Sequence, residues 1–153
     1  MSRLFRRFLL SLLIVYNCYG GEQEPFVRRA TSAAVILKLY ANSGEMEHNK
    51  PHEVMRSRKD LLLFRQMLSR AKVERVKDFN SEGGMCWLVA FDEFGKPLIG
   101  LLYLRSLVPE SVIPFEMENG PLKSRRRIIS KKDMALVVDA KLLKELLRDA
   151  DLL

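Results

Sequence analysis

The sequence predicts an α+β fold in which an antiparallel sheet of about four to five strands carries two amphipathic helices. Two adjoining apolar runs, residues 85–91 and 97–104, are joined by a short turn and read as a hairpin. Two other stretches repeat apolar side chains at helical spacing. The expected order of strand, helix, hairpin, further strands and helix is typical of helices packed on an antiparallel sheet.

The first twenty residues have the layout of an export signal. Arg3, Arg6 and Arg7 form a cationic start, residues 8–16 are apolar, and small or polar residues follow up to Gly20. The apolar run is too short to span a bilayer, which needs roughly 20 residues. We therefore expect residues 1–20 to be a signal peptide and residues 21–153 a single domain in the periplasm or outside the cell. A retained anchor or a core helix is the alternative.

A second interpretation concerns Cys18. The segment before it resembles the lipoprotein signal of bacteria, which implies that the cysteine is lipidated and becomes the first residue of the mature protein. Asn17 departs from that pattern, because Gly, Ala or Ser normally precedes the cysteine. Contact with a membrane is expected only through the signal or a lipidated Cys18. Cys86 is then the one remaining thiol, so the fold depends on its core rather than on a disulfide.

Charge argues against one class of partner. The formal net charge is +7, and it falls to +4 without residues 1–20, since that segment contains three arginines and no acid. A dedicated nucleic-acid binder is expected to be more strongly basic over one face. Nucleic acid is therefore not the expected partner.

Apolar patterning places the N-terminal elements. Residues 33–41 predict a strand, although their alanines leave a helix open, and turn-forming residues stop the run at Gly44. Residues 21–25 read as a polar lead-in, and residues 44–56, which contain Pro51, read as a loop. Ser57 then supplies a helix cap, with Asp60 placed to reach back to it, and an apolar stripe follows.

The hairpin strands are apolar on both faces, which predicts a place near the sheet centre with cover on both sides. Gly100 indicates a bulge or the close approach of another backbone. Further strands are expected at residues 112–117, 126–130 and 134–138, and Pro114 confines the first of these to an edge or an irregular stretch. Asp139 caps a C-terminal helix with an apolar stripe that reaches Ala150.

Two histidines are weak metal candidates. His48 and His52 stand four residues apart among glutamates, a spacing that suits zinc on a helix, but Pro51 weakens the helix that the spacing needs. Cys86 lies in an apolar strand, so it is expected to be a small buried hydrophobe rather than a nucleophile. No cofactor is expected.

The densest charge cluster is the best functional lead. Guanidinium and ammonium groups bind phosphate, sulfate or carboxylate, although cations on an edge strand also prevent sheets from adding to one another. Phe94, in the hairpin turn, is the favoured exposed aromatic contact. The expected anion-binding or partner-binding residues are Lys123, Arg125, Arg126, Arg127, Lys131 and Lys132.

These observations favour an exported, non-enzymatic binding module of the bacterial envelope, which contacts an envelope protein or an anionic polymer or surface. The basis is that the sequence contains no phosphate-binding loop, nucleophile elbow or paired cysteine motif. The competing hypothesis is a small metal-dependent hydrolase that uses His48, His52 and nearby carboxylates.

Overall fold

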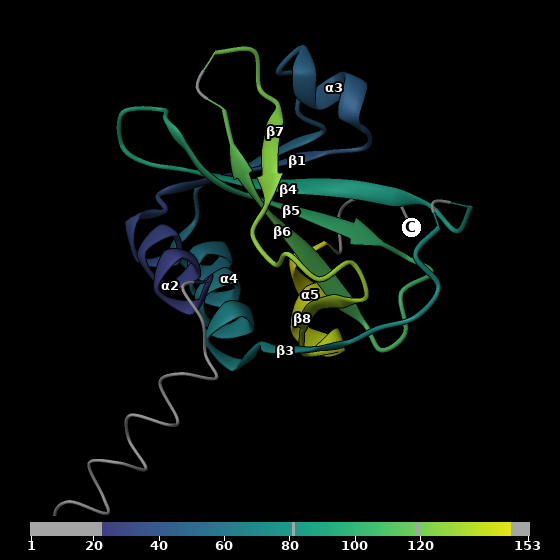
Figure 1. The fold of residues 1–153 in the computed structure, drawn as a ribbon. Helices are drawn as coiled ribbons and strands as arrows, with labels where there is room; N and C mark the ends of the chain where they lie inside the picture. Colours follow the sequence, from purple (N-terminus) through teal and green to yellow (C-terminus); the bar gives the residue numbers. More distant parts are fainter. Residues whose placement is uncertain (1–22, 81, 119, 148–153) are drawn as a thin grey trace, which may run out of the picture.

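Eight strands form one sheet in the computed structural model, which describes residues 23–80, 82–118 and 120–147 (Figure 1). Every strand pair among these residues is antiparallel. The α+β class and the antiparallel sheet are confirmed, but the sheet has more strands, and four helices accompany it. The predicted signal segment with Cys18 and the last expected position of the C-terminal stripe, Ala150, lie outside the described residues.

The order of strands across the sheet is β2-β1-β4-β5-β6-β8-β3, and β7 pairs with β6 beside β8. In chain order the elements are α2 (Gln23–Ala33), β1 (Ile36–Tyr40), α3 (Ser43–Glu47), β2 (Glu53–Met55), α4 (Arg58–Arg70), β3 (Lys72–Arg75), β4 (Met85–Phe91), β5 (Pro97–Leu104), β6 (Ser111–Met117), β7 (Ser124–Arg127), β8 (Met134–Val137) and α5 (Ala140–Leu146).

The hairpin of β4 and β5 lies at the centre of the sheet, as its two apolar faces predicted. Strand β4 pairs with β1 on its other side and β5 pairs with β6. The Asp92 carboxylate closes the turn by accepting from the backbone N–H groups of Phe94 at 2.9 Å and Lys96 at 2.8 Å. Gly95 has a φ of 75°, which a residue without a side chain adopts at little cost.

Three helices cover one face of the sheet. Figure 1 shows α2, α4 and α5 together on this side, where they bury one large apolar cluster. Phe64 from α4 and Leu143 from α5 are almost fully buried there, against Leu37 of β1 and Leu101 of β5. The helical spacing that the sequence shows in α4 and α5 therefore places their apolar stripes on the sheet.

The opposite face is covered by α3 and by loops. Met46 of α3 and Leu122 of the β6–β7 connection bury against Trp87 and Tyr40. Two polar contacts fix this layer: the Trp87 Nε1–H donates to Ser43 Oγ at 3.1 Å, and the Tyr40 hydroxyl donates to the side-chain oxygen of Asn49 at 2.8 Å. The central hairpin is thus covered on both sides.

Several N-terminal expectations were wrong. Pro25 lies inside α2, although residues 21–25 were expected to be a lead-in, and residues 44–56 contain most of α3 and all of β2, although a loop was expected. Strand β3 was not expected at all. These elements are short or weakly patterned, and they are stabilised by non-local partners: β2 pairs with β1, β3 with β8, and α2 packs on α4.

The strand with Pro114 was expected at an edge of the sheet or in an irregular stretch, and it lies in the interior of the sheet. Strand β6 pairs with β5 on one side, while β8 joins Ser111 and Val112 and β7 joins the other end. The Pro114 carbonyl accepts from the Ile128 N–H at 2.9 Å, just beyond the end of β7. Proline lacks the N–H that would return a bond to Ile128, so the paired residues of β6 and β7 end at Phe115 and Arg127.

Two smaller details also differ. Strand β7 covers residues 124–127 rather than residues 126–130. Gly100 is approached by the side chain of Met117 rather than by a backbone, since a Cβ at Gly100 would lie 2.4 Å from the Met117 sulfur. The irregularity in the ladder between β4 and β5 is not at Gly100 but at Ala90 and Phe91, where the register shifts.

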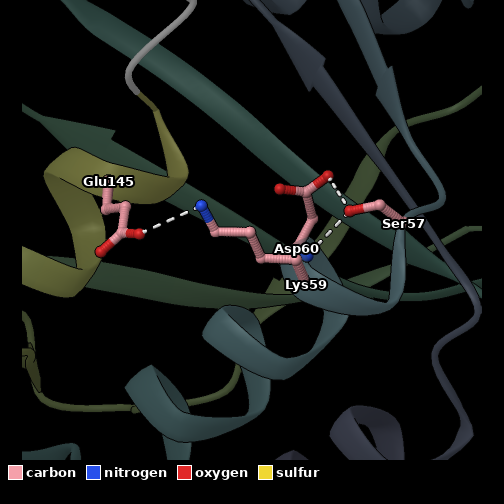
Figure 2. A network of polar contacts seen from close by, with 4 residues as sticks. All are labelled: Ser57, Lys59, Asp60 and Glu145. Atoms are coloured by element: carbon pink, nitrogen blue, oxygen red, sulfur yellow. Dashed lines mark hydrogen bonds and ion pairs between the residues drawn. The ribbon is translucent and has the colours of Figure 1, made fainter.

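We expect Ser57→Ala to lower the free energy of unfolding by about 1 kcal/mol, because Ser57 caps α4. Its Oγ accepts from the Asp60 N–H at 3.0 Å and donates to the Asp60 carboxylate at 2.6 Å (Figure 2). Chemical denaturation followed by circular dichroism measures the effect.

The matched control is Lys59→Ala in the same turn. Lys59 pairs with Glu145 of α5 at 3.6 Å, but both side chains are substantially exposed, so its loss is expected to cost below about 0.5 kcal/mol (Figure 2). A larger loss for Lys59→Ala than for Ser57→Ala would contradict this assignment of the cap.

Candidate binding surface

The basic segment, residues 123–132, runs from the end of the β6–β7 connection through β7 and into the loop before β8. Apolar residues anchor it on both sides of the sheet. Leu122 is buried with Trp87 in the cluster beneath α3, and Ile129 is buried in the cluster beneath the other helices. The backbone between these anchors is therefore held at a defined place on the sheet.

Arg127 fastens the loop to the strand. Its Nη1 donates to the Lys132 carbonyl at 3.1 Å, and its Nη2 donates to the Met134 carbonyl. The guanidinium also lies over the ring of Phe79, 5.4 Å from the ring centroid. Partial burial lowers the pKa of Arg127, and the nearby charge of Asp133 acts in the opposite direction. Because its terminal nitrogens donate to carbonyl groups and its face meets a ring, Arg127 mainly positions the other cations.

The remaining cations of the segment differ in how they are compensated. Arg126 pairs with Glu116 on the neighbouring strand, with 2.8 Å between Nε and Oε2. Lys123, Arg125, Lys131 and Lys132 are exposed, and within residues 23–80, 82–118 and 120–147 none of them forms an ion pair. These four side chains, the exposed cations, are available to an external anion.

An open hollow of about 490 Å³ lies beside Lys132, one of the exposed cations, and is lined by Phe79, Arg127, Lys132 and Asp133. The Asp133 carboxylate is paired with Arg75 at 2.9 Å, so its charge is already balanced. Phe79 supplies an apolar wall of this hollow. No spacing in the sequence connects Phe79 with Arg127, and the contact arises from the fold.

Phe94 lies at the tip of the central hairpin with 86 % of its surface exposed. Because β5 and β6 are antiparallel, this turn and the β6–β7 connection lie at the same end of the sheet (Figure 1). Phe94 is therefore accessible to a partner at the end of the sheet where the basic segment begins.

The two histidines do not share a helix face. His48 follows the last residue of α3, and its ring Nδ1 lies 2.8 Å from the Gly44 carbonyl oxygen. Asn49, with a φ of 48°, ends the helical path, and His52 lies in a bend directly before β2. Across the part of the chain that the structure describes, no three or more His, Cys, Asp or Glu side chains gather in a way that suits a metal ion.

Cys86 is buried in β4, and burial raises the pKa of its thiol to about 12. The cross-strand neighbour Tyr103 donates to Glu110 at 2.7 Å, and burial, followed by this hydrogen bond, raises the pKa of its hydroxyl. A thiol with so high a pKa is neutral at physiological pH, so it packs as an apolar group and lacks the thiolate that a nucleophile needs.

No protein-family model, curated protein or solved structure matches this chain. None of the helices within the described ranges is both long enough and apolar enough to cross a membrane.

We expect Arg127→Ala to lower the free energy of unfolding by about 1–3 kcal/mol, since the Lys132 and Met134 carbonyls lose a charged donor. Urea denaturation measures the loss. Arg125→Ala removes the same charge from an exposed side chain, so its effect is expected to stay within about 0.5 kcal/mol. Equal losses for the two variants would show that Arg127 does not fasten the loop.

Proposed function

We propose that the chain is an exported, non-enzymatic binding module of the bacterial envelope, which contacts an anionic partner through the basic segment. The observation that carries the proposal is the set of exposed cations: Lys123, Arg125, Lys131 and Lys132 project from one short stretch without compensating acids among the described residues. Phe94 is the proposed aromatic contact.

The arrangement suits a multivalent anion. A solvent-exposed ion pair between one cation of the segment and one anionic group of the partner contributes at most about 1 kcal/mol to the binding free energy, so useful affinity requires several such pairs at once. Arg127 keeps Lys131 and Lys132 close to β7, which lowers the entropy cost of presenting them together with Arg125. An anionic envelope polymer, or a protein surface rich in carboxylates, offers the repeated charge that such a segment needs.

The metal-dependent hydrolase remains the competing hypothesis. In residues 23–80, 82–118 and 120–147 no contact favours it, since His48 and His52 do not share a helix face with the neighbouring glutamates. We therefore develop only the binding function.

Replacing Lys123, Arg125, Lys131 and Lys132 together by glutamine tests the basic segment. We expect this variant to elute from an immobilised sulfated polysaccharide at a clearly lower salt concentration than the unaltered protein, because counterion-dependent contacts are removed. Arg127 is left in place so that the loop keeps its position.

The matched control replaces four other exposed cations by glutamine, so that it loses the same net charge: Lys50, Arg56, Lys96 and Lys141. It is expected to retain most of the binding. If both variants lose binding equally, the interaction reflects net charge alone and the basic segment is not the site.

Export makes a separate prediction about mass. Protein purified from its native host is expected to begin at Gly21, or at a Cys18 whose mass includes acyl chains. Intact mass spectrometry distinguishes these products. Unmodified protein that begins at Met1 in the cytoplasm would contradict export without bearing on the anion-binding test.

A further inference from the structure

Strand β3 forms an outer margin of the sheet. It pairs with β8 over its whole length, from Lys72 opposite Val137 to Arg75 opposite Met134, without a register shift. Among the described strands it has no second neighbour, and Figure 1 shows it at the edge of the molecule. All four of its residues are exposed, including Val73 at 43 %. A regular and exposed edge is able to accept another strand.

The alternation of hydrogen bonds shows which backbone groups face outward. The Val76 N–H donates to the Asp133 carbonyl at 2.8 Å, on the β8 side. Because backbone groups alternate along a strand, Lys72 and Glu74 also bond toward β8, whereas Val73 and Arg75 direct their N–H and C=O groups away from the sheet. No backbone partner occurs for these outward groups within the described ranges.

The side chains of β3 are complementary to themselves. If a second copy pairs antiparallel with Val73 opposite the partner's Val73, Lys72 lies opposite the partner's Glu74, and by symmetry Glu74 lies opposite the partner's Lys72. These opposed charges occupy non-hydrogen-bonded positions, where side chains approach most closely. The side chains of Lys72 and Glu74 lie on the same face of the sheet as those of their β8 neighbours Val137 and Ala135. The side chain of Val73 lies on the opposite face, which the helices cover.

Other registers that use the outward groups bring like charges together. A pairing centred on Glu74 sets two carboxylates opposite one another, and a pairing centred on Arg75 sets two guanidinium groups opposite one another. Like charges directly opposite destabilise a strand pair. The sequence Lys72-Val73-Glu74-Arg75 therefore selects one register, centred on Val73.

We propose that β3 is a homodimerisation edge, at which two copies of this chain join their sheets through antiparallel pairing centred on Val73. Reciprocal bonds between the Val73 backbone groups form the centre, the two valine side chains meet on one face, and two Lys72–Glu74 pairs form on the other. The interface is small, so a weak and concentration-dependent dimer is expected. This surface is separate from the basic segment.

Sedimentation velocity of the full chain over a concentration series tests the proposal. The weight-average mass is expected to rise toward that of a dimer at high concentration. Lys72→Glu and Glu74→Lys each place like charges opposite one another at both symmetry-related positions, and each is expected to weaken the dimer by about tenfold or more. The double variant restores opposite charges and is expected to regain the original dissociation constant within about threefold.

Val73→Pro supplies an independent test of the backbone bonds. The N–H of Val73 faces outward, so proline leaves the ladder to β8 intact while it removes the central donor. This variant is expected to be folded and monomeric. Two results would overturn the proposal: a mass that stays monomeric at every concentration, or a dimer that persists unchanged in both single charge variants.

Discussion

The central strands β4 and β5 carry apolar side chains on both faces, and the rest of the fold depends on covering both. Helices α2, α4 and α5 bury one face, including Leu88 and Leu101. The other face, with Trp87 and Val89, is buried by α3 and by loops. Because those loops are held by the core, the backbone positions that carry the charged side chains are also held.

The same constraint explains how the basic segment is presented. Its two apolar anchors lie on opposite sides of the sheet, so β7 and the following loop cannot turn freely. Arg127 then donates its terminal N–H groups to the carbonyl of Lys132 in the loop and to that of Met134 in β8. One arginine that the sequence groups with the expected binding residues thus has a structural role, while Lys131 and Lys132, which follow it, are exposed.

The edge strands β7 and β3 differ in the features that hinder or permit the addition of a further strand. Strand β7 has a register shift next to Ser124 and an intramolecular pair between Arg126 and Glu116, features that discourage the addition of a further strand. Strand β3 has a regular ladder, and its charges alternate in a way that complements a second copy. We therefore expect edge charges to have opposite effects on strand addition at β7 and at β3, because pairing depends on the order of the charges along the strand.

The sequence by itself determined the central hairpin, the capped helices α4 and α5, and the cluster of cations, because each depends on neighbours within a few residues: the Asp92 turn and the Ser57 cap are local contacts. Only the tertiary structure decided β2, β3 and the interior place of the strand with Pro114, since these need partners far along the chain. It also decided which cations remain free, because Phe79, Glu116 and the Met134 carbonyl meet the arginines only after the sheet has formed.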